Sequence, residues 1–495
     1  MRLSAATLAN LPESVLRPTY DRSAAEIGIV HLGVGAFHRA HQAVVIEDCL
    51  ARGEKGWAIA GASLRSADTR DALAAQDNLY TLAVRSAAGE QLRIIGALHE
   101  CHVAPEKPAA LLARMAAPAT RIVSLTVTEK GYCHDPATGT LNEVHPDILH
   151  DLAHPDAPRS AIGYLAKALR LRRAAGLSPF TVLCCDNLPA NGRTVKRVID
   201  RFAQLLDKDF GQWVAGEVAC PASMVDRIVP ATTDEDRARI SAALGLEDRW
   251  PVVTEPFLQW VVEDVFPAGR PDLALSGVEM VRDVTPFEHM KLRLLNGAHS
   301  TIAYLGYLAG HETVAETMAD PAFATMIRAM MDEEITPTLA MPAGTDLDGY
   351  KGALIERFRN PALRHRTWQI AMDGSQKLPQ RLLGTIRDRL KTGAPVDRLA
   401  LGVAGWMRYV SGTDEKGAPI DVRDPLAARL AGVAAAAGPV ADRLAPALFG
   451  IPEIFGTDLS ADPRFTKPVT TALTALFRDG AAKAVASMAK QDQAG

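Results

Sequence analysis

The chain has 495 residues, of which 48% are apolar and 23% are charged, and its formal net charge is -4. This length exceeds what one hydrophobic core usually serves, so we expect two domains. The small net charge, without a Lys/Arg block interleaved with aromatic residues, argues against a nucleic-acid or membrane-surface partner. A small acidic substrate stays open, because a local basic pocket does not show in the total charge.

The six cysteines are scattered and form no Cys-x-x-Cys pair. This pattern excludes a disulfide framework or a zinc ribbon and favours free thiols in a reducing compartment. The N-terminal segment MRLSAATLANLPESV lacks the apolar core of a signal peptide. No apolar run approaches the roughly 20 residues that span a bilayer. We therefore expect a globular cytoplasmic protein, either a monomer or a small homo-oligomer.

Apolar runs rich in Ile, Val and Leu alternate with helical patterns in the first half of the chain. Continuous apolar strands separated by helices indicate a parallel sheet that is covered on both faces. The helical segment 161–177 ends in basic residues and a glycine, as a crossover helix should. We predict a doubly wound α/β domain over residues 1–284, with these runs as strands: 27–34, 57–64, 120–128 and 180–187.

The composition changes at Thr285. The segment that starts TPFEHMKL offers an N-cap threonine, a proline at the first helical position and a capping-box glutamate, Glu288. Ala, Leu, Met and Arg dominate the rest of the chain, and convincing β-branched strands are missing from its sequence. We predict a mostly α-helical second domain over residues 285–495.

The stretch IVHLGVGAFHRAHQA continues the first predicted strand into Gly33 and Gly35. Two glycines between a strand and a helix can place backbone N–H groups against a pyrophosphate. An ordinary tight turn is the alternative, since a third small residue is replaced by a histidine. The nearby histidines lack partners with metal-ligand spacing, which disfavours a metal. The candidate cofactor-binding residues here are Gly33, Gly35, Ala36, Phe37, His38 and Arg39.

The end of the second predicted strand is where α/β dehydrogenases discriminate between NAD and NADP. An acid there binds the ribose hydroxyls of NAD, whereas an arginine tolerates the extra phosphate of NADP. The segment GASLRSADTRD contains both kinds of residue. Asp68 favours NAD, and Arg65 keeps NADP open.

One helical segment, KLRLLNGAHS, combines a lysine, an amide and an imidazole. On an α-helix Asn296 and His299 lie about 140° and 80° around the axis from Lys291. A lysine can transfer a hydroxyl proton, an amide can stabilise an alkoxide, and an imidazole can orient an alcohol. A solvated lysine and a helix irregularity at Asn-Gly are the alternative. Asn187 comes after an apolar strand, at the sheet edge where ligands bind, although it could equally be a turn residue.

Six motifs together resemble the polyol-specific long-chain dehydrogenase family: GIVHLGVGAFHRAHQA, IVSLTVTEKGYC, CDNLPANG, MVDRIVP, KLRLLNGAHS and DGSQKLPQR. They run in the family's order from about residue 27 to residue 410. The resemblance implies a Rossmann-type N-terminal domain, a helical C-terminal domain, a nicotinamide cofactor and no metal. With Asp68 after the second strand, we expect NAD rather than NADP.

The resemblance also implies roles for individual residues. Lys291 would be the acid/base, Asn187 and Asn296 the oxyanion hole, and His299 a substrate-positioning group. Asp226 would be a substrate-site carboxylate, with an ion pair near Arg227 as the alternative. Glu129 and Glu288 would line a proton path, although helix capping alone accounts for Glu288.

Basic residues near the end of the matched region resemble the fructuronate reductase branch of the family. Arginine binds carboxylates bidentately, so this branch implies a sugar-acid substrate, D-mannonate or D-fructuronate. Mannitol 2-dehydrogenase activity on the same scaffold is the first alternative, and a nicotinamide-binding regulator without catalysis is the second. The residues assigned here to substrate binding are Arg293, Arg364, His365 and Lys377; Arg366 and Arg381 are expected to form surface or interdomain pairs.

Overall fold

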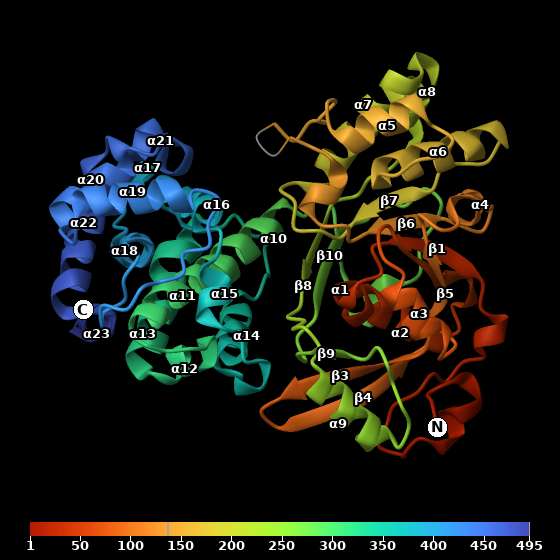
Figure 1. Ribbon diagram of the computed structural model, residues 1–495, viewed down its shortest axis with the longest axis horizontal. Helices are drawn as coiled ribbons and strands as arrows, with labels where there is room; N and C mark the ends of the chain where they lie inside the picture. The colour runs from red at the N-terminus through yellow and green to blue at the C-terminus, as the bar shows by residue number, and fades with distance from the viewer. Residues whose placement is uncertain (136–137, 495) are drawn as a thin grey trace. The chain divides into compact units, whose positions relative to one another are not determined.

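The computed structural model describes residues 1–135 and 138–494, and it divides into two compact units, Met1–Thr285 and Pro286–Gly495 (Figure 1). The strands of the first unit are β1 (Ile27–Leu32), β2 (Ala58–Ser63), β3 (Tyr80–Ser86), β4 (Gly89–Ile95), β5 (Leu98–Val103), β6 (Ile122–Leu125), β7 (Thr181–Cys184), β8 (Ser223–Asp226), β9 (Val252–Thr254), β10 (Gln259–Glu263) and β11 (Glu279–Val281).

Helices alternate with these strands. The α-helices are α1 (Ala36–Ala40), α2 (Gln42–Ala51), α3 (Asp68–Ala74), α4 (Pro108–Ala116), α5 (Pro146–Ala153), α6 (Ala161–Ala174), α7 (Asn191–Leu206), α8 (Lys208–Glu217) and α9 (Asp234–Leu244). The short 3-10 turns are η1 (Ala5–Asn10), η2 (Arg22–Ala24), η3 (Lys55–Trp57), η4 (Glu129–Tyr132) and η5 (Leu273–Ser276).

The main sheet is parallel, with strand order β5-β2-β1-β6-β7, which is the doubly wound arrangement predicted from the sequence. Successive residues of β1 point to opposite faces. Val30 and Leu32 pack in a core with α4, α6 and α7, whereas Ile29 packs in a core with α2. Both faces are therefore buried, as the continuous apolar runs predicted.

Two small sheets accompany the main one, with orders β11-β10-β8 and β4-β3-β9. They were not predicted from the sequence. Several of their strands have only three or four residues, which is too short for a periodic pattern to be recognised. The β8 strand matters for function because its last residue is the candidate Asp226.

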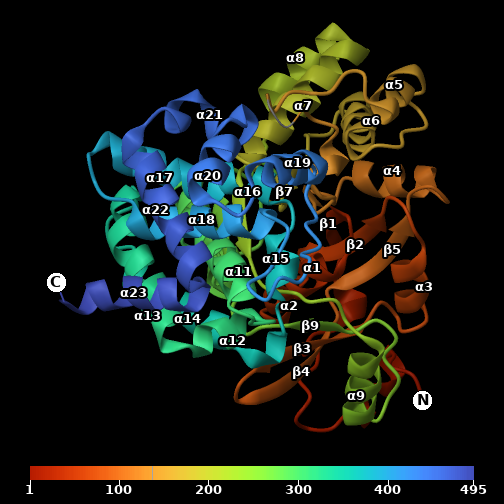
Figure 2. The same cartoon turned by 60° about the vertical axis from the view of Figure 1, so that its left-hand side comes forward.

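The second unit is mostly helical, as predicted, and among its described residues strand pairing is limited to isolated bridges. Figure 2 shows its helices from a second direction. Its α-helices are α10 (Thr285–Met290, which begins at the boundary), α11 (Ala298–Leu308), α12 (Val314–Ala319), α13 (Pro321–Ala329), α14 (Leu347–Arg359), α15 (Thr367–Ala371), α16 (Gly374–Leu378), α17 (Gly384–Lys391), α18 (Asp397–Val410), α19 (Ala427–Ala437), α20 (Ala441–Phe449), α21 (Pro452–Ser460), α22 (Pro463–Asp479) and α23 (Ala481–Ala494).

Shorter helical turns join these elements: η6 (Lys291–Gly297), η7 (Met330–Ile335), η8 (Thr336–Thr338), η9 (Pro361–Leu363) and η10 (Pro379–Leu383). Of these, η6, η7 and η10 are π-helical. The unit's core is built around α11 and α18, which are buried along nearly their whole length. Gly402 allows this close packing, because a Cβ there would lie 2.6 Å from the hydroxyl of Thr301.

Candidate functional site

The two glycines after β1 differ in why the structure needs a glycine at each position. Gly33 has φ +95°, and a Cβ added there would lie 2.1 Å from the carbonyl oxygen of Thr126, so only glycine fits the backbone. Gly35 is the N-cap of α1 and has an extended backbone conformation. The atom nearest to a Cβ added at Gly35 is the carbonyl oxygen of Gly33, at 3.8 Å. Gly35 therefore keeps a space open at the start of α1. A phosphate fits such a cradle, because the first N–H groups of a helix point into it.

The next side chains along α1 do not line this cradle. His38 is buried and its ring stacks on His31 at 3.4 Å between centroids. Arg39 is 4% exposed, donates to the carbonyl oxygen of Trp250 and lies over the ring of Tyr80. The prediction that His38 and Arg39 contact the cofactor is therefore wrong, because α1 turns both side chains into the core.

Ala36 and Phe37 are partly exposed at the start of α1, and they remain predicted cofactor contacts. The segment after β2 also keeps its predicted place. Arg65 lies in the turn and Asp68 begins α3, and neither side chain is buried. Their position at the carboxyl end of the strand next to β1 is where a ribose would be recognised.

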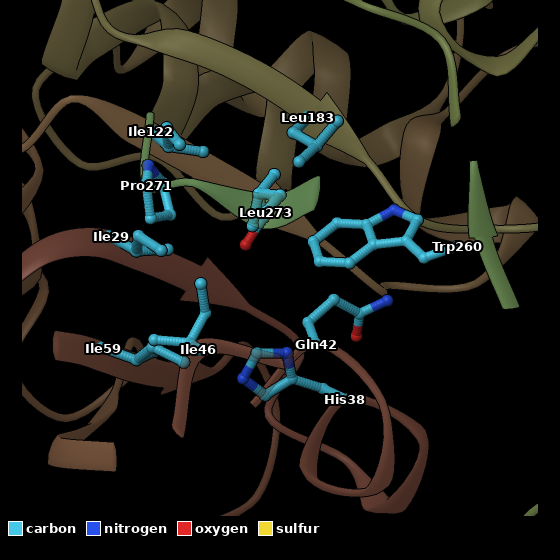
Figure 3. A pocket seen from close by; sticks show the side chains of 11 residues that line it. Ile29, His38, Gln42, Ile46, Ile59, Ile122, Leu183, Trp260, Pro271 and Leu273 are labelled. Carbon is cyan, nitrogen blue, oxygen red and sulfur yellow. The ribbon is translucent and has the colours of Figure 1, made fainter. Parts of the chain in front are cut away.

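A small cavity lies on the α2 side of the main sheet, with a volume of about 20 Å³. Figure 3 shows that isoleucines from neighbouring strands surround it and that His38, Gln42 and Trp260 close one side. Its volume suffices for about one water molecule. This cavity is therefore a packing defect of the core and too small for a nicotinamide cofactor.

Three of the candidate residues lie near the carboxyl ends of strands in the first unit. Asn187 is exposed after β7, and Glu129 is exposed after β6, as the first residue of η4. Asp226 is buried at the end of β8, opposite Gln259. The neighbouring Arg227 donates to the carbonyl oxygens of Ala40 and Glu255.

In the second unit, Lys291 and Asn296 lie on η6, which is a π-helix rather than the predicted α-helix. Because π-helical hydrogen bonds join residues five apart, a five-residue separation brings two side chains to the same side. The α-helical estimate of about 140° between them is therefore wrong, and the π-turn aligns them better. Such turns occur frequently at functional sites.

The start of α10 also differs from the prediction. The helix includes Thr285 itself, and the carboxylate of Asp283 accepts a hydrogen bond from the Thr285 N–H at 3.0 Å. Asp283 therefore takes the capping role that the sequence pattern assigned to Thr285. Glu288 lies in the first turn of α10 and is partly exposed.

His299 lies on α11, buried between two rings of the second unit. It contacts Phe358 at 4.7 Å and His365 edge-on at 5.1 Å between centroids. Burial lowers the pKa of His299 well below its usual value, and the positive charges of Arg381 and Arg357 lower it further. Burial also lowers the pKa of His365. His299 is therefore a neutral imidazole that can orient a hydroxyl group.

The predicted carboxylate-binding residues have different surroundings. Arg293 forms an ion pair with Asp388 at 2.7 Å and donates to the carbonyl oxygen of Thr338. A carboxylate of the chain thus already contacts its guanidinium, and the assignment of Arg293 to substrate binding stays a prediction. Arg364 has a backbone φ of +43° at the end of η9.

Lys377 and Arg381 lie near each other in the sequence and have partners within the second unit. Lys377 donates to the carbonyl oxygens of Ile370 and Met372, at the end of α15. Arg381 donates to the hydroxyl of Ser300, next to His299. Arg381 was expected to form only a surface or interdomain pair, and no sequence signal separated it from the other arginines.

Asp186 was not among the residues predicted from the sequence, although it lies within the CDNLPANG motif. Its carboxylate accepts hydrogen bonds from Val127, Thr128 and Tyr132. The one available signal was its position immediately before Asn187.

Among the described residues, one group could hold a metal ion: Cys133, His145 and Asp147, whose ligand atoms lie within 4.8 Å of one another. The Nδ1 atom of His145 already accepts the N–H of Asp147 as the cap of α5. Within the same described part of the chain, no helix combines the length and apolar character needed to cross a membrane.

Two family models match the chain, one per unit: the mannitol dehydrogenase Rossmann domain over residues 27–275 and the mannitol dehydrogenase C-terminal domain over residues 283–477. A D-mannonate oxidoreductase of Escherichia coli (strain K12) is 49% identical over 484 residues, 97% of this chain and 99% of that protein. A mannitol 2-dehydrogenase of Aspergillus fumigatus is 43% identical over 475 residues, 94% of each chain.

Two solved structures are similar over nearly the whole chain. The Pseudomonas fluorescens mannitol 2-dehydrogenase, in a ternary complex with NAD and D-mannitol, has a TM-score of 0.86 and 40% identity, covering 99% of this chain and 100% of that one. A D-sorbitol dehydrogenase in substrate-free form has a TM-score of 0.91 and 34% identity, covering 98% and 100%.

Proposed function

Because this chain belongs to the mannitol dehydrogenase family of oxidoreductases, we propose that it interconverts D-mannonate and D-fructuronate with NAD. The observation that carries the choice of a sugar acid is the group of basic side chains beside His299. His365 contacts its ring edge-on at 5.1 Å, and Arg381 donates to the hydroxyl of Ser300, the next residue along α11. A carboxylate gains from a neighbouring guanidinium, whereas a neutral polyol does not.

Four residues are proposed to transfer the proton, to stabilise the reacting oxygen and to orient the substrate. Lys291 gives its proton to the carbonyl oxygen during reduction and takes it back during oxidation. The amides of Asn187 and Asn296 donate to the same oxygen while it carries negative charge. The neutral ring of His299 orients the substrate hydroxyl. Asp226 is proposed to bind a substrate hydroxyl, and Glu129 and Glu288 to connect the lysine with solvent.

The proposed cofactor fits the loop after β1. The nicotinamide supplies or accepts the hydride when the cofactor is bound. The open space at Gly35 and the first N–H groups of α1 would hold its pyrophosphate. Asp68 would accept hydrogen bonds from the ribose hydroxyls, which favours NAD, while Arg65 lies where a 2′-phosphate would need it.

The test is a substrate panel with the purified protein. NADH and NADPH oxidation are measured with D-fructuronate and D-fructose, and NAD reduction is measured with D-mannonate and D-mannitol. We expect the highest kcat/KM for the acid pair with NAD. A clear preference for mannitol and fructose would overturn the sugar-acid assignment, and a preference for NADPH would overturn the assignment of Asp68.

Mannitol 2-dehydrogenase activity is the second candidate. It is supported by the 43% identical Aspergillus relative and by the structural similarity to a protein solved in a ternary complex with NAD and D-mannitol. The variant Arg381→Gln separates the two candidates. It should lower kcat/KM for D-mannonate by tenfold or more while changing that for D-mannitol by less than threefold. Arg293→Gln is the comparison variant: because Arg293 is paired with Asp388, the ratio should change less than in Arg381→Gln.

A further inference from the structure

The carboxylate of Asp186 joins two loops at the carboxyl edge of the main sheet. One of its oxygens accepts the Val127 N–H at 2.9 Å and the Tyr132 hydroxyl at 2.7 Å. The other accepts the Thr128 N–H at 3.2 Å. Asp186 itself comes after β7, whereas all three donors come after β6. The side chain therefore fixes the distance between these neighbouring strand ends.

The loop that it holds is strained. Thr128 has φ +65° and Cys133 has φ +49°, at the two ends of η4. Such conformations are unfavourable for residues other than glycine and persist only when the surroundings impose them. The bonds to Val127, Thr128 and Tyr132 supply that constraint. Glu129 begins η4, so the position of its carboxylate depends on them.

The backbone of Asp186 is fixed from the other side by Asn191. The Asn191 amide donates to the carbonyl oxygens of Asp186 at 3.1 Å and Ser223 at 2.7 Å. Ser223 begins β8, the strand that ends in Asp226. Asn187 follows Asp186 directly in the chain. One network therefore connects the ends of β7 and β6, which are followed by Asn187 and Glu129, with the start of β8.

We infer that Asp186 is a positioning residue for the reaction: it orients the Asn187 amide and the Glu129 carboxylate without contacting the substrate. The inference rests on the proposed function, because it assigns those two residues to the oxygen and the proton path. The proximity of Glu129 agrees with it, since this carboxylate adds to the effect of burial in raising the pKa of Asp186.

The variant Asp186→Asn tests the inference with almost no change in volume. An amide has only one accepting oxygen, so its NH₂ group must face either the Thr128 N–H or the Val127 N–H. Two donors then face each other, and that hydrogen bond is lost. The β6 loop is expected to shift. Because a misplacement of about 1 Å can cost about a hundredfold in rate, kcat should fall tenfold to a hundredfold. NADH affinity should stay within twofold, since the Gly35 cradle is untouched.

Asp151 provides a matched control in the same unit. Its carboxylate also accepts two backbone N–H groups, of Arg159 and Ser160, and one hydroxyl, of Ser160, and it contacts Nδ1 of His150 as well. It lies on α5 and anchors the start of α6 rather than the sheet edge. Asp151→Asn should lower thermal stability like Asp186→Asn but leave kcat within twofold. Tyr132→Phe, which removes the hydroxyl bond to Asp186, should lower kcat three- to tenfold.

Each variant is assayed for kcat, KM, the pH profile of kcat and thermal midpoint, on both the acid and the neutral substrate pairs. A loss confined to kcat, with a changed pH profile, supports the positioning role. Equal losses in Asp186→Asn and Asp151→Asn, or a kcat within twofold of wild type, would overturn it. If only mannitol and fructose are turned over, the proposed substrate is wrong, and the same comparison on that pair still decides the role of Asp186.

Discussion

The glycine pair after β1 leads to the sharpest prediction, because alanine at Gly33 should lower stability, whereas alanine at Gly35 should weaken cofactor binding. Gly33→Ala places a Cβ 2.1 Å from a backbone oxygen of Thr126 at φ +95°. The positive φ costs about 1–3 kcal/mol and the overpacking a further ~1–3 kcal/mol. The free energy of unfolding should therefore fall by about 2–6 kcal/mol.

Gly35→Ala should have no such cost. Its backbone has φ -83° and ψ -171°, which alanine adopts readily, and the nearest atom to the new Cβ is 3.8 Å away. Removing a glycine restricts the unfolded chain, so stability should be unchanged or rise by about 0.4–1 kcal/mol. The same methyl group fills the proposed phosphate cradle. We expect the Kd for NAD to rise at least tenfold, or about 1.4 kcal/mol.

Urea denaturation measures the stabilities, and the shift in thermal midpoint with NAD measures binding. At about 100 times Kd a bound cofactor stabilises the folded state by about 2.7 kcal/mol, which gives a clear shift for the wild type. A tenfold rise in Kd in Gly35→Ala should remove about half of it, or ~1.3 kcal/mol. A Gly35→Ala protein that binds NAD within twofold of wild type would refute the cradle, and a Gly33→Ala protein of wild-type stability would refute the backbone reasoning.

Three further outcomes are expected. Arg293→Gln should cost about 1 kcal/mol in urea denaturation, because it breaks a mostly buried ion pair with Asp388; an unchanged midpoint would show that the pair contributes nothing. Lys291→Met should reduce kcat about 10²–10⁴-fold while NAD still shifts the thermal midpoint, and retained turnover would exclude Lys291 as the acid/base. Burial lowers the pKa of four imidazoles, those of His31, His38, His299 and His365. Below about pH 6.5 the unfolded chain binds protons at these residues that the folded protein does not, so the free energy of unfolding should fall by up to about 1.4 kcal/mol per pH unit for each of them. Equal denaturation midpoints at about pH 7.5 and 5.5 would contradict this.

The sequence alone was sufficient for the fold class. The four apolar runs are β1, β2, β6 and β7 of the parallel sheet, and the crossover helix is α6. The change of composition at Thr285 was the basis for the predicted start of the helical part, and the two units divide between Thr285 and Pro286. The fold class was predicted correctly because strand and helix periodicities are local and are repeated over many residues. The three-residue strands β9 and β11 carry no comparable signal.

Side-chain partners depended on the tertiary structure. Arg293 looked like a carboxylate receptor because it lies close to Lys291, but its partner Asp388 lies 95 residues further along the chain. Arg39 looked like a phosphate ligand, but it is buried against Trp250, 211 residues away. A charged side chain takes whichever counter-charge or carbonyl the fold brings near it, and residue type and spacing do not encode that choice.

The candidate residues themselves came from the sequence, whereas the alignment of Lys291 with Asn296 on η6 came from the fold. Local pattern was enough to single out Lys291, Asn296 and Asn187 as chemically complementary groups. It could not show that η6 is π-helical. A π-helix has one more residue than an α-helix in each hydrogen-bonded turn, and packing decides between the two. It also could not show that Asp186 holds a strained loop beside Asn187, because that contact joins two strands whose pairing exists only in the folded chain.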